Sequence, residues 1–181
     1  MESMLLETER MLLRPITVED VPFIYKLFSR AETNQFTQFP DITSVVEVSS
    51  MNVHYMNPAD TTLYRAIMKL KALRAPIGAL GLFSYSKTHK RAELGYDLLR
   101  EYWGKGLMTE AVREVLEHSF TELDLIRIDA TVDPDNISSI KLLERTGFKF
   151  EACLRKRFYY RDKWHDEHFY GLLKEEWENT S

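Results

Sequence analysis

The sequence predicts a mixed α/β fold, and three observations carry this prediction. Three consecutive stretches, Leu63–Leu70, Ile77–Ser86 and Ala92–Leu99, have the short apolar runs and turn-forming breaks typical of strands. Further along the chain, two stretches with helical spacing enclose one that alternates as a strand does. The length of 181 residues suits one well-buried core and is short for two, so we expect a single domain over residues 1–181.

The composition is that of a globular protein with an acidic balance. Hydrophobic residues make up 44% of the chain, charged residues 29%, and the formal net charge is -4. Because nothing suggests a broad positive field, we expect no nucleic-acid partner and favour a cationic one. The first residues carry charges where a signal peptide or membrane span needs an apolar run, so we expect no membrane partner and a cytoplasmic location. The single cysteine, Cys153, cannot form an internal disulfide, and we expect it to pack rather than react.

The first elements are a predicted strand and helix. Leu5–Arg14 reads as a short strand, and Thr17 followed by Asp20 resembles a capping box before a helix that ends at Phe28. The next stretch, Arg30–Asp60, has no clear period apart from some helical character. We expect it to form loops that bind an acceptor. Its acidic residues include Glu32, Asp41, Glu47 and Asp60.

The three strand-like stretches predict antiparallel hairpins at the centre of a sheet, because breaks at 74–76 and 87–90 separate them. A helix is predicted over Leu107–Phe120, and a second over Ile137–Arg145 after the turn 133–136. Gly147 stands where a left-handed C-terminal cap favours glycine, and Phe148 should pack back on that helix. Between the helices, a strand with one buried face is predicted from the alternation of Ile126, Ile128, Ala130 and Val132.

The C-terminal part predicts a β-hairpin, because Phe150–Tyr159 and His165–Leu173 flank the turn 161–164. On a strand, His165 and His168 would point to opposite faces, so we expect no metal site there. Given the acidic balance, aromatic residues are expected in the core or at its rim rather than as a platform for nucleic-acid bases. These are Trp103, Tyr159, Tyr160 and Trp164.

The stretch "REYWGKGLMTE" places two glycines around Lys105, after a strand and before a helix. In such a loop, backbone N–H groups of the first helical turn face outward and can bind an anion. A Walker loop would need Ser or Thr after the lysine, but Gly106 stands there, and Thr109 occupies the place of a third dinucleotide-binding glycine. ATP and dinucleotides are therefore disfavoured relative to coenzyme A. A turn whose glycines only relieve backbone strain remains an alternative.

Together, "ELGYDLLREYWGKGLMTEA" and "DPDNISSIKLLERTGF" resemble the acyl-coenzyme A signature of the GNAT superfamily, the Gcn5-related N-acetyltransferases. The opening "LLETERMLLRPITVED" and the closing "FYYRDKWHDEHFYGLL" extend the resemblance over nearly the whole chain, within the branch of ribosomal-protein-alanine N-acetyltransferases. The resemblance implies a GNAT-like fold whose mixed, mostly antiparallel central sheet is flanked by helices and splayed at the cofactor site, with a C-terminal β-hairpin.

The resemblance also implies acetyl-CoA as cosubstrate and a set of residues that bind it. The backbone near Leu98 and Leu99 would hydrogen-bond the pantetheine arm or the reacting oxygen, and Asn136 would reach the pantetheine. A helix N-cap is the alternative role of Asn136. In this family the loop begins at the position of Trp103, and Met108 stands where Gly or Ala is usual. The pyrophosphate cradle would consist of Gly104, Lys105, Gly106, Leu107 and Met108.

The implied reaction is direct attack of a neutral primary amine on the thioester, without a metal. The resemblance points to Glu93 as general base, with Asp97 in reserve on the same strand face. Ser139 would protonate the leaving thiolate, since Leu143 occupies the place of the tyrosine acid of other members.

The acceptor is expected to be a protein N-terminal α-amine, whose pKa of about 8 leaves more neutral amine than the value of about 10.4 for lysine-type nitrogens. A polyamine or aminoglycoside-like acceptor and a non-catalytic acyl-CoA sensor stay open as alternatives. The pI of about 5.8 disfavours a structural partner of the ribosome. The family implies a monomer or a homodimer.

Overall fold

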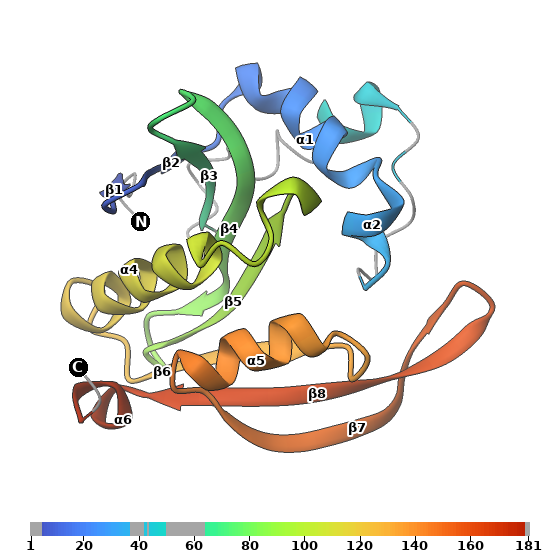
Figure 1. Cartoon of the computed structure of the whole chain (residues 1–181). Helices are drawn as coiled ribbons and strands as arrows, with labels where there is room; N and C mark the ends of the chain where they lie inside the picture. The colour runs from blue at the N-terminus through green and yellow to red at the C-terminus, as the bar shows by residue number, and fades with distance from the viewer. Residues whose placement is uncertain (1–4, 37–41, 43, 50–63, 180–181) are drawn as a thin grey trace.

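The computed structural model describes residues 5–36, 42, 44–49 and 64–179. Eight strands form one sheet in the order β1-β2-β3-β4-β5-β6-β8-β7 (Figure 1). All neighbouring strands are antiparallel except β5 and β6, which are parallel. The strands are β1 (Leu6–Glu7), β2 (Met11–Pro15), β3 (Tyr64–Leu70), β4 (Ala75–Ser86), β5 (Arg91–Leu98), β6 (Arg127–Val132), β7 (Lys149–Tyr160) and β8 (Lys163–Leu173).

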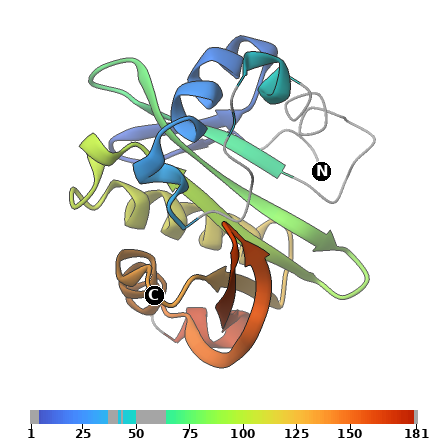
Figure 2. The same cartoon turned by 90° about the vertical axis from the view of Figure 1, so that its right-hand side faces the viewer.

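Helices flank the sheet and lie between its strands in the sequence. In Figures 1 and 2, β6, β7 and β8 with helix α5 lie below the part formed by β1 to β5. Two 3-10 turns, η1 (Val18–Asp20) and η2 (Arg100–Tyr102), precede α1 and the glycine loop. Residues 45–49 are also helical. The other helices are α1 (Val21–Phe28), α2 (Ala31–Asn34), α4 (Leu107–Thr121), α5 (Ile137–Arg145) and α6 (Lys174–Glu178).

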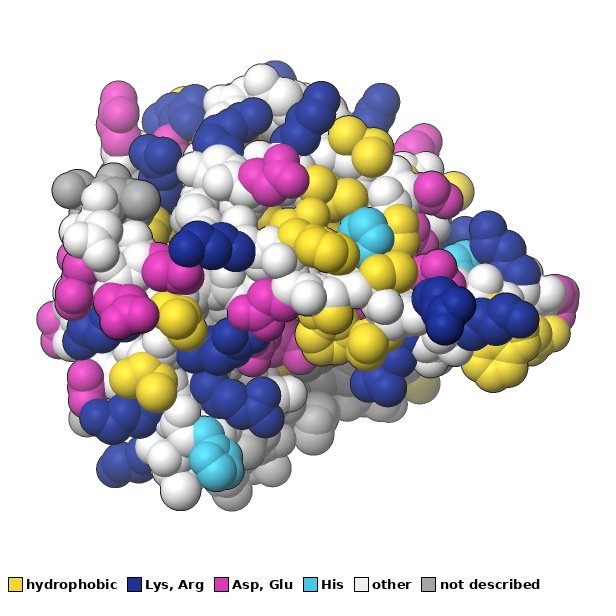
Figure 3. Space-filling view, turned by 90° about the horizontal axis from the view of Figure 1, so that it is seen from below, with side chains coloured by type: hydrophobic (Ala, Val, Ile, Leu, Met, Phe, Trp, Pro, Cys, Tyr) yellow, Lys and Arg dark blue, Asp and Glu magenta, His cyan; other side chains and the backbone are white. Residues whose placement is uncertain are grey.

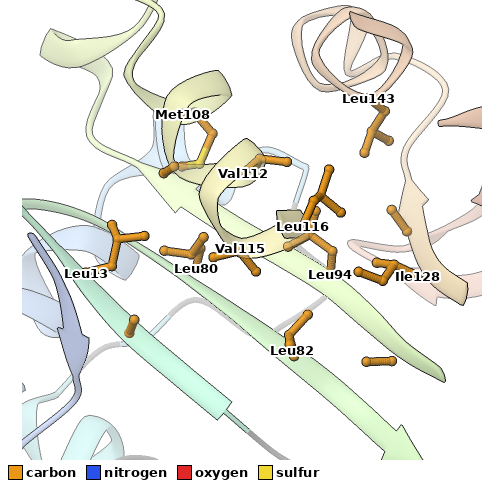
Figure 4. Packing of buried hydrophobic residues seen from close by; sticks show 14 of the residues in the cluster. Leu13, Leu80, Leu82, Leu94, Met108, Val112, Val115, Leu116, Ile128 and Leu143 are labelled. Atoms are coloured by element: carbon orange, nitrogen blue, oxygen red, sulfur yellow. The ribbon is translucent and has the colours of Figure 1, made fainter. Parts of the chain in front are cut away.

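The core consists of two apolar clusters, one on each face of the sheet. The larger cluster packs α4 and α5 against the strands, with Leu80 and Leu94 facing Val112 and Leu116 (Figure 4). The smaller cluster packs α1 against the opposite face, where Ile67 is fully buried. Burial of one such side chain contributes about 1.5–3 kcal/mol, so these clusters fix the helices on the sheet.

The sheet opens between β5 and β6. These strands pair only from Arg91 to Glu93 with Arg127 to Asp129, although β5 continues to Leu98 and β6 to Val132. Beyond Glu93 the facing edges of the two strands are therefore not bonded to each other. This confirms the predicted splay in a mixed, mostly antiparallel sheet.

The predicted single strand over Leu5–Arg14 is wrong, because the chain reverses at residues 8–10. Thr8 Oγ1 accepts a hydrogen bond from the Met11 N–H at 3.0 Å, and the Thr8 N–H donates to the Met11 carbonyl at 2.9 Å. The result is the hairpin of β1 and β2. After it, the Asp20 carboxylate accepts a hydrogen bond from the Thr17 N–H at 2.8 Å, so the predicted pair does begin a helical segment.

The two helices of the cofactor signature agree closely with the sequence. Helix α5 begins and ends where predicted, and Gly147 after it has a φ of 96°, in the left-handed region. The Phe148 N–H donates to the Leu143 carbonyl at 3.0 Å, and the Phe148 side chain is buried. The prediction that Ile126 belongs to the buried face of the strand between these helices is wrong, because Ile126 precedes β6 and is exposed. Helix α6 was not predicted.

The C-terminal hairpin is a long ribbon that projects beyond the rest of the fold (Figure 1). Its turn is tighter than predicted, with only Arg161 and Asp162 between the strands, both at positive φ. At the projecting end, hydrophobic and basic side chains are mixed (Figure 3). Cys153 lies on this ribbon and is exposed, so the expectation that it packs is wrong. Tyr159 and Trp164 are also exposed and contact each other edge to face, at the rim rather than in the core.

The stretch Arg30–Asp60 is described only in part. Within it, α2 and the helical residues 45–49 agree with the predicted helical character. Asp41 and Asp60 lie outside the described residues, as does Leu63, the predicted start of β3.

Candidate active site

A cavity of about 670 Å³ lies where β5 and β6 separate. Its walls come from β5, the loop before α4, β6 and α5, and α2 contributes at one side. A cavity of this size suits a small-molecule ligand. Most of the predicted site residues line it, namely Glu93, Leu98, Trp103, Gly104, Gly106, Leu107, Met108, Asn136 and Ser139. Leu99 and Lys105 are not among the lining residues.

The glycine loop has the backbone conformation that its sequence predicts. Gly104 and Gly106 have φ values of 71° and 73°, in the left-handed region that disfavours other residues. Gly106 is the N-cap of α4, so the N–H groups of the first helical turn have no partner within the helix. The side chains of Leu107 and Met108 are buried in the core, so these residues offer a ligand their backbone N–H groups. This arrangement suits a phosphate group.

Arg10, which the sequence did not single out, fixes the other side of this loop. Its Nη1 donates to the Lys105 carbonyl at 3.0 Å, and its Nε donates to the Glu110 carboxylate at 2.6 Å. Burial alone would raise the pKa of Glu110, but hydrogen bonds from Thr8 and Arg10 lower it. The β1–β2 turn thereby supports the loop from outside the cavity. The Lys105 ammonium itself lies over the Tyr102 ring, 5.3 Å from its centroid.

The end of β5 presents one backbone donor to the cavity. The Leu99 N–H donates to the Ile77 carbonyl at 3.0 Å and its side chain is buried, so the expected role of Leu99 as a donor in the site is not supported. Successive N–H groups of a strand point to opposite edges, which directs the Leu98 N–H to the open edge. The Leu98 carbonyl accepts a hydrogen bond from Trp103 Nε1 at 2.7 Å. Trp103 therefore closes the loop against β5.

Glu93 lies at the point where the two strands separate. Its carboxylate accepts a hydrogen bond from Thr131 Oγ1 at 3.2 Å. Burial raises the pKa of Glu93, the Thr131 hydrogen bond lowers it, and the nearby charges of Glu167 and Asp129 raise it further, with a net increase. A carboxylate with a raised pKa is a better proton acceptor near neutral pH than an ordinary one.

Asp97 lies on the same face of β5 as Glu93, but its carboxylate forms an ion pair with Arg65. Arg65 Nη2 donates to its carboxylate at 2.8 Å, and the side chains of Arg65 and Asp97 are 6% and 17% exposed. Burial raises the pKa of Asp97, and the Arg65 guanidinium opposes this increase. Arg65 also lies over the Phe28 and Phe83 rings. The geometry thus favours Glu93 over Asp97 as a base.

The start of α5 brings a hydroxyl into the cavity. Asn136 Oδ1 accepts hydrogen bonds from the Ser139 N–H at 3.1 Å and from Ser138 Oγ at 2.9 Å, so Asn136 is the helix N-cap. Its amide NH₂ group remains a donor for a ligand. Ser139 Oγ lies 2.7 Å from the Tyr96 hydroxyl. Tyr96 lies on the same face of β5 as Leu94, which is the face that packs under α4 and α5.

The described residues contain no group of three or more His, Cys, Asp or Glu side chains placed to hold a metal ion. His165 lies 3.6 Å from Asp133 and contacts the Tyr160 carbonyl, while His168 packs edge to face with Phe150. Within the described ranges, no helix is both long and apolar enough to span a membrane.

Comparisons with known proteins identify the family of this chain. Residues 10–149 match the family model described as an acetyltransferase (GNAT) domain. An uncharacterized N-acetyltransferase, p20, from Bacillus licheniformis is 33% identical over 174 residues, which cover 95% of this chain and 97% of the relative.

Two solved structures show the same fold. A spermidine N-acetyltransferase from Vibrio cholerae in complex with CoA and spermine has a TM-score of 0.85 and 24% identity, and the match covers 94% of this chain and 99% of that one. RimL, a ribosomal L7/L12 α-N-protein acetyltransferase in complex with coenzyme A, has a TM-score of 0.86 and 19% identity, with coverages of 94% and 98%. The resemblance to the GNAT superfamily and the predicted fold are confirmed.

Proposed function

This chain belongs to the GNAT acetyltransferase family, and we propose that it transfers the acetyl group of acetyl-CoA to the α-amine of a protein or peptide N-terminus. The family establishes an acetyl-CoA-dependent N-acetyltransferase. The roles of individual residues and the choice of acceptor are our proposal. The observation that carries it is the position of Glu93 in the cavity, with a raised pKa and no ion pair among the described residues.

The residues around the cavity fit acetyl-CoA, which supplies an acetyl group activated as a thioester. The backbone N–H groups of Gly104 to Met108 would bind the pyrophosphate at the start of α4. The Leu98 N–H at the open edge of β5 and the Asn136 amide would bind the pantetheine arm. Two solved neighbours carry coenzyme A in the same fold, which supports this assignment.

Glu93 would act as the general base. It would take a proton from the attacking amine, directly or through water, while the amine nitrogen forms its bond to the acetyl carbon. Thr131 holds one oxygen of the Glu93 carboxylate and so limits its rotation. Ser139 would interact with the leaving sulfur and stabilise the negative charge that develops there.

The charges near Glu93 favour a singly charged acceptor. Nearby carboxylates are paired with arginines: Asp97 with Arg65 at 2.8 Å, Asp129 with Arg127 at 2.5 Å, and Glu167 with Arg157 at 3.7 Å. A polyamine carries several positive charges and would need several carboxylates to balance them. An α-amine carries one charge and, with a pKa of about 8, is partly neutral at pH 7. This supports a peptide N-terminus.

A polyamine is the second candidate. Glu32, an exposed carboxylate of α2, lines the same cavity and could balance a second ammonium group. A structural neighbour was solved with spermine, which supports the same alternative by analogy.

The experiment is a competition between acceptors. The purified protein is incubated with acetyl-CoA and an equimolar mixture of spermidine, a lysine-containing peptide with a free N-terminus, and the same peptide with a blocked N-terminus. Mass spectrometry then locates the added acetyl group. We expect it on the α-amine of the free peptide. Transfer to spermidine or lysine alone would overturn the choice of acceptor.

A further inference from the structure

Tyr96 and Ser139 form a hydrogen-bonded pair across the open part of the sheet. Tyr96 belongs to β5 and Ser139 to the first turn of α5, and their hydroxyl oxygens are 2.7 Å apart. Both residues line the cavity. The pair bridges β5 and α5 beyond Glu93, where β5 and β6 are no longer paired. It therefore lies in the part of the cavity where the acetyl thioester would be held.

Either hydroxyl can donate in this pair, so the direction of the hydrogen bond depends on where the two protons point. Burial raises the pKa of Tyr96 well above its ordinary value, and the Ser139 hydrogen bond only partly offsets this. The phenol thus keeps its proton near neutral pH. Among the described residues, Ser139 is the only hydrogen-bond partner of the Tyr96 hydroxyl. If Tyr96 donates, its proton is satisfied, and the Ser139 hydrogen is left to point elsewhere.

We propose that Tyr96 is a positioning residue for the leaving-group step: its phenol donates to Ser139 Oγ and thereby directs the Ser139 hydrogen to the sulfur of coenzyme A. This rests on the proposed function. The start of α5 fixes the backbone of Ser139, because the Ser139 N–H donates to Asn136 Oδ1 at 3.1 Å. Asn136 holds the Ser139 backbone and Tyr96 holds the Ser139 oxygen. The Ser139 hydrogen can then point to a ligand in the cavity.

The chemistry of the step favours hydrogen bonding over full proton transfer. When the carbon–sulfur bond breaks, its electron pair goes to sulfur, and the amine proton passes to Glu93. A thiol has a pKa of about 8.5, so it is a stronger acid than the buried phenol of Tyr96 or a serine hydroxyl. Neither residue would therefore lose its proton. The Ser139 hydroxyl stabilises the thiolate as a donor, and the thiolate takes its proton from water on release. This refines the predicted role of Ser139 as an acid.

The first test is a double-mutant cycle with Tyr96→Phe, Ser139→Ala and the double variant. A hydrogen bond to a charged group predicts a decrease in kcat of about tenfold or more for each single variant, with KM for acetyl-CoA little changed. The double variant should be no slower than Ser139→Ala, because Tyr96 acts only through Ser139. Tyr85→Phe is the matched control, since Tyr85 packs against the same core from β4 but does not line the cavity.

The second test does not depend on turnover. The thiol pKa of coenzyme A bound to the protein is measured from the absorbance of the thiolate as the pH is raised. The wild type should lower this pKa, and both Tyr96→Phe and Ser139→Ala should move it back toward the value in free coenzyme A. A merely structural role of Tyr96 would change the melting temperature without moving the thiol pKa.

The outcomes separate the two proposals. If the wild type transfers no acetyl group to any amine, the proposed function fails. If the wild type is active but Tyr96→Phe has the kcat and the bound thiol pKa of the wild type, the positioning role of Tyr96 is overturned. Additive effects in the double variant would overturn it as well, because they would show that Tyr96 acts independently of Ser139.

Discussion

Asp97 accepts a hydrogen bond from Arg65 Nη2 at 2.8 Å, whereas Glu93 on the same face of β5 accepts one from the Thr131 hydroxyl at 3.2 Å. Two carboxylates of one strand therefore have different surroundings. Both line the cavity and burial raises the pKa of both, but Asp97 balances the buried Arg65 cation, whereas Glu93 has no ion pair among the described residues. This difference leads to opposite expectations for the two carboxylate-to-amide substitutions.

Asp97→Asn should reduce stability. The substitution leaves the Arg65 guanidinium buried without its counter-charge, and loss of one partner of a buried ion pair costs about 3–5 kcal/mol. Urea denaturation followed by circular dichroism measures this loss directly. A variant as stable as the wild type would show that the ion pair contributes nothing to the fold.

Glu93→Gln should increase stability near neutral pH. The folded-state pKa of Glu93 is raised, so its favourable contribution is fully present below the unfolded-state pKa and is lost as the pH rises through the folded-state pKa. Glutamine is never ionised and avoids that loss. Thermal melts of both proteins should converge as the pH falls toward about 4. Equal melting temperatures at pH 8 would contradict the raised pKa.

Gly104→Ala should weaken acetyl-CoA binding without a steric clash. No heavy atom lies within 4 Å of a Cβ at this position, but its φ of 71° costs an alanine about 1 kcal/mol. Relaxation of that strain would turn the loop N–H groups away from the phosphates, and we expect affinity to fall about fivefold or more in calorimetry.

Gly147→Ala is the matched control for this loop. Gly147 has a φ of 96° but ends α5 outside the cavity. The control should lose stability and keep its acetyl-CoA affinity. If both variants bound acetyl-CoA like the wild type, the glycine loop would only turn the chain.

Arg10→Ala should also weaken acetyl-CoA binding, although Arg10 does not line the cavity. It removes the hydrogen bonds to the Lys105 carbonyl and to Glu110 that support the loop from behind. Because Arg10 is partly exposed, we expect a decrease in affinity of up to about fivefold. Arg113→Ala, an exposed arginine on α4, is the control and should bind like the wild type.

The elements that were predicted well are those with local signals. Helix α5 agrees from its first to its last residue, because Asn136 caps its start and Gly147 its end. The glycine loop also agrees with the sequence prediction, because Gly104 and Gly106 mark the turn before α4. The N-terminal hairpin was missed because its turn has neither Gly nor Pro, and the Thr8 side chain supplies the turn's hydrogen bond instead.

The missed parts of the site depend on contacts between distant residues. Arg10 and Glu110 are separated by 100 positions, and Tyr96 and Ser139 by 43. No local pattern records either pair. Strand alternation puts Tyr96 on the face opposite Glu93, but only the opening of the sheet shows that this residue also borders the cavity. Cys153 was misjudged because it lies on β7, the last strand of the sheet, and is exposed there although its partner His168 pairs with β6 on the other side.

The rate of acetyl transfer by Glu93→Gln at saturating acetyl-CoA, with the acceptor used best by the wild type, tests the central claim most directly. If Glu93 is the base, the rate should fall by about 10²–10⁴-fold, while calorimetry shows an unchanged acetyl-CoA affinity. A Glu93→Gln variant that transfers acetyl groups as fast as the wild type would contradict the assignment of Glu93 and the mechanism built on it.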